Sequence, residues 1–314
     1  QEFCIFWLSD TPINNPYKEK IPSFFMEPKV INDVEKKVKK SLEDLEKKKI
    51  LSKKDKIVVA LSGGKDSTTV AYLLKKFGYK IEGFHINLGL GKYSEECLEK
   101  INELCEMLDM KLHTYEVKKE MGSSMCYLRS VIQTSNGGKG LKNCAICGVA
   151  KKWIMNREIR KIKPKFIATG HNLDDEAQTF LINLFKGSPK LSANTGIVTR
   201  NKKAEKSKKF IPRIKPLFYV PESNIREYSK IKKLPVDYDK CPCAFDSYRI
   251  QVRSFLEKID NEKKENIIKN FDRIYPKIEK LKQDSGELKF CKICNEPSRN
   301  KVCKKCQLFN LGKK

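Results

Sequence analysis

The stretch LSGGKDS, residues 61–67, joins a short apolar segment to a segment whose apolar residues recur at helical spacing. A glycine-rich turn between a strand and a helix is a favourable anion site, because the helix N-terminus presents unpaired N–H groups and the positive end of the helix dipole. Adjacent glycines let the backbone approach phosphate oxygens closely. The stretch therefore predicts a phosphate-binding loop, and the structural alternative is a tight turn that binds nothing.

The loop is not a Walker P-loop, which has four residues between its glycines and a Gly-Lys-Ser/Thr ending. Here Gly63 and Gly64 are adjacent, and Asp66 stands inside the loop. Any phosphate site at this turn therefore belongs to a different class of nucleotide-binding protein.

Strand and helix patterns alternate on the C-terminal side of this turn. Four short apolar segments predict strands, at residues 57–61, 81–86, 112–117 and 166–169. Four segments with helical periodicity follow them, at residues 66–77, 94–108, 148–160 and 174–185. Such alternation implies parallel strands with ligands at their carboxyl ends. We therefore expect an α/β fold, with helices on both faces of a parallel sheet.

The remainder of the chain divides into smaller parts. Residues 1–28 contain four prolines and predict an irregular extension, and residues 29–54 predict a linker helix. The α/β region, residues 55–250, is the expected catalytic domain. A charged helical segment, residues 251–288, and a small C-terminal zinc ribbon, residues 289–314, are expected to follow it.

The composition is strongly basic: 65 lysines and arginines against 39 acidic residues give a formal net charge of +26. A field of this size attracts polyanions, and contacts to phosphates release condensed counterions. We therefore expect a nucleic-acid partner rather than a merely solubilising surface. The basic loop at residues 200–209 either contacts RNA or is a solvated tip.

Cysteine usage and hydropathy bear on the compartment. Eight of the twelve cysteines lie in CxxC pairs or in a Cys-Pro-Cys segment, which favours metal binding in a reducing compartment over disulfides. The other four are interpreted as small hydrophobic side chains, namely Cys4, Cys97, Cys105 and Cys126. The chain shows no signal-peptide pattern and no apolar run near the ~20 residues that span a bilayer. We expect a cytoplasmic protein with no membrane partner.

A second polar motif, GHNLDDEA at residues 170–177, follows the fourth predicted strand. It should therefore reach the same edge of the sheet as the glycine-rich turn. Carboxylates beside phosphates are typical of Mg²⁺ sites, whereas an aspartate at a helix start is also a common cap. Both roles can hold, with one aspartate capping and the other at the nucleotide. His171 is either catalytic or structural.

Two groups of cysteines predict metal chemistry. Cys291-x2-Cys294-x8-Cys303-x2-Cys306 has the spacing of a closed, structural tetrahedral zinc site.

The CxxC pair of Cys144 and Cys147 stands alone at a predicted helix start, where a thiolate near lysines has a lowered pKa. This pair is a redox dithiol, half of a metal site, or inert. Cys241 and Cys243, which flank a proline, decide among these interpretations if they lie nearby.

The loop at residues 61–67 resembles the PP-loop of ATP pyrophosphatases, written SGGxDS, which cut ATP between the α and β phosphates. Other motifs resemble those of TtuA-type tRNA 2-thiouridine synthetases, a group that includes archaeal and eukaryal wobble-uridine thiolases. They are INLG at 86–89, CAICG at 144–148, GHNLDDEA at 170–177, RIKPL at 213–217 and CPCA at 241–244. The resemblance covers about residues 55–250 and the C-terminal cysteine module.

This resemblance implies a PP-loop fold and a 4Fe–4S cluster held by only three cysteines. Transferred by position, the cluster ligands are Cys144, Cys147 and Cys241, so that one iron stays open to a sulfide or persulfide. Cys243 stands where the family usually has an aromatic residue. It is interpreted as a small side chain in that place, with contact to the open iron or a persulfide relay as the alternative.

The implied reaction has two steps on a tRNA uridine, at position 34 or 54. The uridine C2 oxygen attacks the α-phosphate of ATP and releases pyrophosphate, and sulfur then displaces AMP to leave 2-thiouridine. The implied catalytic residues are Cys144, Cys147, Cys241 and Asp66. The implied ATP contacts are Ala60, Ser62, Gly63, Gly64, Lys65, Asp66, Ser67, Ile86, Lys151, Gly170 and Asp175.

The resemblance also implies cofactors and partners. The cofactors are the 4Fe–4S cluster, Zn²⁺ at the four C-terminal cysteines and Mg²⁺, with ATP as a substrate. The partners are tRNA, a sulfur donor and a second copy of the chain in a homodimer. The donor is sulfide or a thiocarboxylated ubiquitin-like protein.

One feature departs from the family, and several alternatives stay open. Family members usually begin with a second zinc module, but the first 55 residues here contain only Cys4 and no histidine. The alternatives are a PP-loop cytidine 2-thiolase, a cluster-free PP-loop synthetase or amidotransferase, a zinc-ribbon RNA-binding protein without catalysis, and a cluster-free persulfide carrier.

Overall fold

A computed structural model describes residues 23–135, 137–188, 191–192, 195–199, 209–244, 249–280 and 289–309. Four predicted features lie wholly or partly outside these residues. They are the N-terminal extension as far as residue 22, with Cys4, the basic loop at residues 200–208, the end of the charged helical segment, residues 281–288, and the end of the C-terminal module, residues 310–314.

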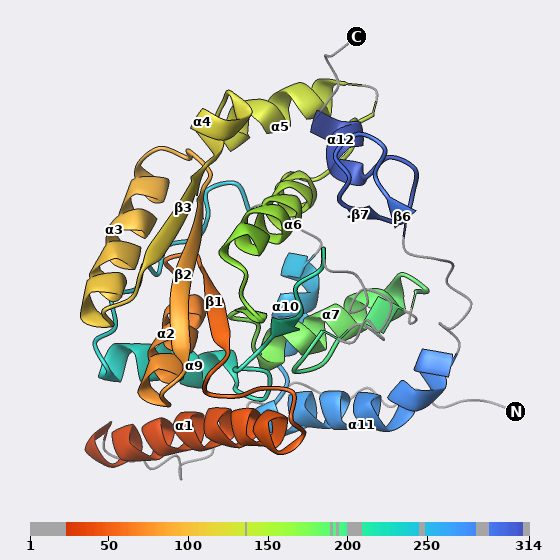
Figure 1. The fold of residues 1–314 in the computed structure, drawn as a ribbon. Coiled ribbons are helices and arrows are strands. Elements are labelled where there is room, and N and C mark those ends of the chain that lie inside the picture. Colours follow the sequence, from red (N-terminus) through yellow and green to blue (C-terminus); the bar gives the residue numbers. More distant parts are fainter. Residues whose placement is uncertain are drawn as a thin grey trace, which may run out of the picture.

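Five parallel strands form the central sheet (Figure 1). They are β1 Lys56–Leu61, β2 Lys80–Asn87, β3 Leu112–Glu116, β4 Phe166–Ala168 and β5 Arg213–Ile214. Their order is β3-β2-β1-β4-β5, and each neighbouring pair is parallel. From β1 the chain first adds β2 and β3 on one side of the sheet. It then crosses to the other side of β1, where β4 and β5 follow. The switch point between β1 and β4 is where a parallel sheet offers a ligand crevice.

Helices cover both faces of this sheet, so the predicted α/β fold is confirmed. Those of the main body are α1 Ser23–Lys47, α2 Lys65–Lys76, α3 Lys92–Met107, α4 Val117–Met121, α5 Met125–Thr134, α6 Asn143–Ile162, α7 Leu173–Phe185, α9 Glu222–Ile231, α10 Arg249–Glu257 and α11 Asn261–Lys280. The C-terminal module consists of β6 Lys289–Phe290, β7 Pro297–Ser298 and α12 Lys304–Phe309. No described helix is long and apolar enough to cross a membrane.

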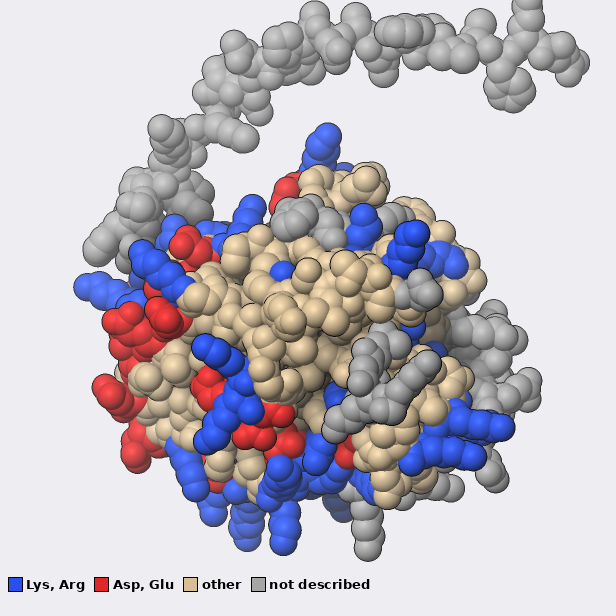
Figure 2. Space-filling view, turned by 90° about the horizontal axis from the view of Figure 1, so that it is seen from above, with Lys and Arg blue, Asp and Glu red and all other residues tan. Residues whose placement is uncertain are grey.

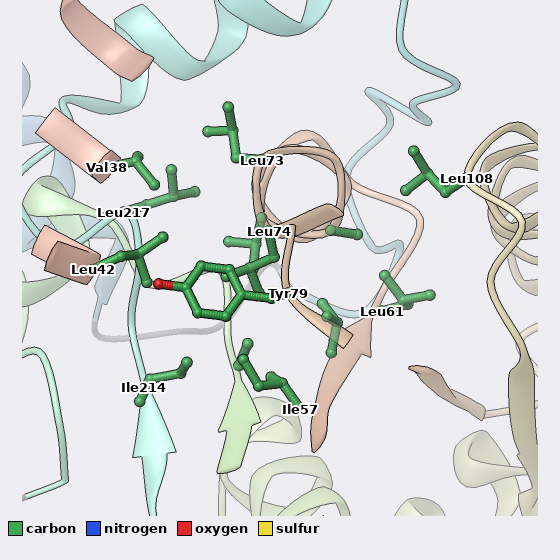
Figure 3. Packing of buried hydrophobic residues seen from close by; sticks show 14 of the residues in the cluster. Val38, Leu42, Ile57, Leu61, Leu73, Leu74, Tyr79, Leu108, Ile214 and Leu217 are labelled. Atoms are coloured by element: carbon green, nitrogen blue, oxygen red, sulfur yellow. The ribbon is translucent and has the colours of Figure 1, made fainter. Parts of the chain in front are cut away.

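The alternation of side chains along β1 divides the core into two layers. Ile57, Val59 and Leu61 face one side, where they pack with α2, α3 and α9 and with the apolar stripe of α1 (Figure 3). Val58 faces the other side and packs with Ile154 and other residues of α6. Successive residues of a strand point to opposite faces, so both faces of this short apolar strand are buried, as expected for a parallel sheet.

The structure moves several boundaries that the sequence predicted. Helix α1 begins at Ser23, so the predicted irregular extension ends earlier than residue 28. Pro28 lies inside this helix, where a proline near the N-terminus removes at most one intrahelical bond. Helix α6 begins at Asn143 rather than Gly148, and the sequence did not predict α4, α5 or β5.

The C-terminal module packs on the main body beside α5 and α6 (Figure 1). Leu308 of α12 contacts Ile132 of α5 and Ile146 of α6 in one apolar cluster. Further along α6, the Arg160 guanidinium donates to both carboxylate oxygens of buried Glu296 in the module. The C-terminal module therefore supports both α5, which carries Cys126, and α6, which carries Cys144 and Cys147.

Candidate active site

A cavity of about 340 Å³ opens at the carboxyl ends of the strands. Its walls combine the turn after β1, the end of β2, one side of α6 and the loop after β4. Eight of the eleven predicted ATP contacts line it, namely Ala60, Ser62, Asp66, Ser67, Ile86, Lys151, Gly170 and Asp175. Cys241 lines the same cavity. The fold thus gathers the predicted nucleotide segments and one predicted cluster ligand around a single space.

Two glycines allow this gathering, because each sits where a side chain would collide with backbone. Gly63 has φ +81°, and a Cβ there would lie 3.0 Å from backbone atoms of Cys97. A Cβ on Gly170 would lie 2.8 Å from the backbone nitrogen of Ser67. The first glycine lets the turn lie against α3, and the second lets the loop after β4 lie against the start of α2.

The turn after β1 is held by its own serines. Ser67 Oγ accepts a hydrogen bond from the Ser62 N–H at 3.1 Å and donates one to the Gly64 carbonyl at 3.1 Å. Gly64 is the N-cap of α2 and offers no side chain to satisfy the first N–H groups of the helix. A rigid turn at an uncapped helix N-terminus is an anion site.

Lys65 does not line this cavity. Its ammonium group contacts Asp66 at 3.0 Å and Glu222 at 2.8 Å, and with Gly64 it lines a neighbouring cavity of about 880 Å³. Burial lowers the pKa of Lys65, but the two carboxylates outweigh burial and raise it overall. Lys65 is therefore a charged side chain held by Glu222 of α9. Gly63, two residues earlier in the same turn, packs on α3 instead.

Asp175 serves both of the roles that the sequence left open. Its side chain and that of Asn172 form a capping box at the start of α7, and it also lines the cavity. Burial, and then the negative charge of Asp66, raise the pKa of Asp175 to about 6. Two carboxylates that repel each other beside an anion site are a suitable donor set for Mg²⁺, which would relieve the repulsion.

The neighbouring polar residues of this motif have structural partners. Asp174 accepts a hydrogen bond from Lys264 at 2.7 Å and one from the Glu222 N–H at the start of α9, so it ties α7 to α9 and α11. His171 lies within hydrogen-bonding distance of Thr169 Oγ1, at 2.9 Å. His171 is exposed to solvent where it lines the cavity, and partial desolvation and nearby cations lower its pKa, so its ring is neutral at physiological pH.

The three cysteines predicted to hold a cluster converge from two segments. Cys144 and Cys147 lie in the first turns of α6, and Lys151 follows Cys147 by one turn, at the cavity wall. Cys241 reaches the cavity from the loop after α9. The sulfurs of this trio do not come within 4.8 Å of one another, a criterion that only the C-terminal quartet meets among the described residues.

The surroundings of the trio nevertheless suit an iron–sulfur cluster. Arg129 of α5 is buried, 8 % exposed, and its guanidinium lies among the thiols of Cys126, Cys147 and Cys243. Its Nε and Nη1 atoms have no hydrogen-bond partner among the described residues. A buried cation with spare N–H donors beside cysteines fits thiolate and sulfide ligands, which accept such bonds and carry negative charge.

Several cavity residues escaped the sequence analysis. His85 is 5 % exposed, and its Nδ1 lies 3.1 Å from the Leu61 carbonyl. Its Nε2 has no partner among the described residues. Tyr93 of α3 lines the cavity beside Cys97. His85 directly precedes Ile86, and this position was the only sequence feature that could have identified it. Tyr93 and Arg129 stand outside every recognised motif.

The C-terminal cysteines form a compact site. The four sulfurs lie within 4.8 Å of one another, and three of the cysteines are buried. Cys291 Sγ accepts backbone N–H bonds from Ile293 and Cys303. Burial opposes ionisation of Cys291, but these backbone donors outweigh it and lower its pKa to about 6. Thiolates gathered by backbone N–H groups in this way fit a tetrahedral Zn²⁺.

Comparison with known proteins identifies the family of this chain. A sequence profile of the PP-loop domain matches residues 31–258, and the chain belongs to this family. It is 35% identical to the tRNA-5-methyluridine(54) 2-sulfurtransferase of Pyrococcus horikoshii, over 86% of this chain and 83% of that protein. It is 30% identical to the tRNA 2-thiolation protein NcsA of Haloferax volcanii, over 80% of this chain and 81% of that protein.

A solved structure gives the same result. The U34-tRNA thiolase NcsA from Methanococcus maripaludis, with its 4Fe-4S cluster, superposes with a TM-score of 0.71 at 29% identity, over 91% of this chain and 89% of that one. Within the PP-loop family, the chain therefore belongs with the tRNA 2-thiolation proteins. The resemblance drawn from the sequence motifs is confirmed.

Proposed function

We propose that the protein is an ATP-dependent tRNA uridine 2-sulfurtransferase, in which the uridine C2 oxygen is adenylated and then replaced by sulfur. One observation carries the proposal: the PP-loop turn and Cys241 line the same cavity. Activation by ATP and delivery of sulfur act on the same carbon of the base, so both must be possible without release of the intermediate. The relatives, which are named as tRNA 2-sulfurtransferases, support this assignment.

For the first step, the turn after β1 binds the pyrophosphate portion of ATP. Ser62 and the N-terminus of α2 supply neutral donors to the phosphate oxygens, and the hydrogen bonds of Ser67 fix the geometry of the turn before the nucleotide arrives. Asp66 and Asp175 hold Mg²⁺ against the phosphates. Attack by the uridine C2 oxygen forms a bond to the α-phosphorus, and the bond to pyrophosphate breaks. Lys151, which lines the same cavity, supplies positive charge to the same phosphates.

For the second step, Cys144, Cys147 and Cys241 hold a 4Fe–4S cluster and Arg129 neutralises part of its charge. The cluster, when bound, supplies an iron with an open coordination position at which sulfur can be held. Sulfur adds to uridine C2, the C2–oxygen bond breaks, and AMP leaves with the oxygen. Cys241 lines the cavity that the phosphate-binding turn also lines, so sulfur held at this cysteine would have access to the base.

The proposal also includes the binding of tRNA and of a structural zinc ion. Lysines and arginines spread around the rim of the face that carries α4 and α5 (Figure 2), and the net charge of +26 favours a polyanion. The four C-terminal cysteines hold Zn²⁺. We further propose a homodimer that acts in the cytoplasm on uridine 34 or 54, because relatives named for each position match this chain.

The test is anaerobic thiolation of tRNA with ATP, Mg²⁺ and sulfide by protein whose cluster has been reconstituted, followed by nucleoside analysis. We expect 2-thiouridine to form only with ATP, and Cys241→Ala to form none. Formation of 2-thiocytidine instead would assign the cytidine 2-thiolase alternative. Full activity of protein without iron would overturn the role of the cluster.

A further inference from the structure

Two cysteines outside the predicted ligand trio meet beside it. Cys126, the second residue of α5, and Cys243, in the loop after α9, have their sulfur atoms 4.0 Å apart. They are 117 positions apart in the chain. Cys126 is exposed and Cys243 is half-buried. Rotation of the two side chains would bring the sulfurs to the roughly 2.0 Å of a disulfide without a long backbone movement.

The buried arginine described above supplies a second, independent observation. Arg129 follows Cys126 by one turn of α5, and its Nη2 donates to Cys126 Sγ at 3.5 Å. The side chain is more than nine-tenths buried, and Nε and Nη1 remain without partners among the described residues. Leaving N–H groups of a buried cation unsatisfied costs free energy. Donors placed here therefore point to an anionic ligand.

The position of the pair relates it to the active cavity. The Ala244 N–H donates to the Cys241 carbonyl at 3.0 Å, which closes a turn around Cys243. Cys243 is thus fixed two residues from Cys241, which lines the cavity. A small anion released at the pair has the Arg129 guanidinium and Cys147 as its neighbours.

We propose that Cys126 and Cys243 form a dithiol that accepts sulfane sulfur from a persulfide donor and releases it as hydrosulfide at the sulfur site. This inference rests on the proposed function, because it names the class of sulfur source for the same cavity. Exposed Cys126 is the acceptor, Cys243 is the resolving thiol, and Arg129 receives the released anion.

The chemistry balances in three steps. The Cys126 thiolate attacks the outer sulfur of the donor persulfide; a new S–S bond forms, and the donor leaves as a thiolate. The Cys243 thiolate then attacks Cys126 Sγ; the disulfide bond between the cysteines forms, and hydrosulfide leaves with the electron pair of the broken S–S bond. A small-molecule or protein dithiol finally returns two electrons to the disulfide and restores both thiols.

The experiment compares two sulfur sources in a single turnover. Full-length protein with its cluster is reduced, freed of thiols and given tRNA and ATP with either sulfide or glutathione persulfide. With persulfide, wild type should form 2-thiouridine together with a Cys126–Cys243 disulfide, detected by peptide mass spectrometry. Cys126→Ser and Cys243→Ser should lose persulfide-driven thiolation at least about tenfold and keep sulfide-driven thiolation. Cys105→Ser, a buried thiol of α3, is the control.

A second measurement does not depend on thiolation. Protein without cluster, treated with glutathione persulfide, should release one hydrosulfide per disulfide formed, and neither serine variant should do so. Persulfide-driven thiolation that survives in both variants, or wild type that forms no disulfide, would overturn the dithiol. Loss of activity with both sources in Cys243→Ser would place this residue in the reaction itself and also overturn the relay. Failure of wild type with sulfide would instead refute the proposed function.

Discussion

The two groups of cysteines in this protein are built in opposite ways. The C-terminal quartet comes from sixteen consecutive residues, Cys291 to Cys306, and its sulfurs are already within 4.8 Å of one another. The central thiols come from α5, α6 and the loop after α9, and they are exposed or half-buried. A local site can be assembled by a short turn, whereas the central site exists only when the whole sheet has folded.

The difference extends to electrostatics. In the quartet, backbone N–H groups satisfy the sulfurs of Cys291 and Cys303. At the central site, the positive charge of the buried Arg129 side chain faces the thiols instead of backbone N–H groups. Two of its nitrogens have no hydrogen-bond partner among the described residues. A fully satisfied site suits a permanent ion. An incompletely satisfied one suits chemistry in which sulfur arrives and leaves. The following predictions test this contrast.

The largest effect is expected at the central site. Cys241→Ala should lower sulfide-driven thiolation by more than about 100-fold, because it removes a proposed cluster ligand that lines the cavity. The thermal midpoint should change little, since the side chain is not part of the described apolar core. Thiolation and calorimetry on the same preparation measure both. A large drop in thermal midpoint would mean that the central site also supports the fold.

The quartet should show the reverse pattern. Zinc binding is worth roughly 10–16 kcal/mol in isolated zinc modules, so Cys294→Ser should unfold residues 289–309 and expose them to protease. Thiolation should fall about tenfold at most, through the lost contacts of α12 with α5 and α6. Metal analysis and limited proteolysis measure this, with Cys105→Ser as control. A variant that keeps its zinc and resists protease would contradict the assignment.

A smaller effect is expected at Asp175, which belongs to the nucleotide side of the cavity. Its folded pKa of about 6 lies above the ordinary value, so protonation stabilises the native state at low pH. That contribution is complete below the unfolded pKa and is lost as the pH rises through about 6. At pH 7.5, Asp175→Asn should therefore leave the thermal midpoint unchanged or higher, while thiolation falls about tenfold through weaker Mg²⁺ binding.

The same variant gives a pH test. Wild-type activity should rise between pH 5 and pH 7 as the Asp175 carboxylate ionises, and the variant should lack this rise. Asp55→Asn, at an exposed ion pair with Lys165, provides the matched control. Identical pH profiles for wild type and Asp175→Asn would show that another group controls the rise.

The sequence predicted four of the five strands of the sheet, and the quartet, because their signals are local. Each of these four strands is a short apolar run, and the quartet is defined by spacing alone. Strand β5, Arg213–Ile214, is too short to give such a signal. Helix α1 was placed too late because the prolines of the first 28 residues were interpreted as irregular structure, although Pro28 lies within the helix. Helix α5 is amphipathic, as are the helices that were predicted, but it was not identified in the sequence; its start depends on Ser124, whose side chain accepts from the Tyr127 N–H.

Two side-chain interactions around the site could not be predicted, because the partners lie far apart along the chain. Cys126 was interpreted as a small hydrophobic side chain, yet it is exposed and meets Cys243 across 117 positions. Lys65 was expected at the nucleotide, yet it is held by Glu222 across 157 positions. Such pairings depend on how helices pack on the sheet, which no local pattern encodes.

The smallest effect is expected where the two cysteine regions are joined. Glu296 is buried and accepts from Arg160 and Asn156 of α6. Glu296→Gln keeps the shape and one acceptor oxygen but removes the charge, so the free energy of unfolding should fall by ~1–2 kcal/mol. Thiolation should stay within about twofold, because the cluster residues lie at the other end of α6.

Denaturant unfolding measures the change in the free energy of unfolding. The control is Glu96→Gln, in an exposed pair with Lys92, which should change this free energy little. If Glu296→Gln instead lowered thiolation as strongly as Cys294→Ser, the module would act on the central site through this ion pair, and the contrast between a structural and a reactive cysteine site would no longer hold.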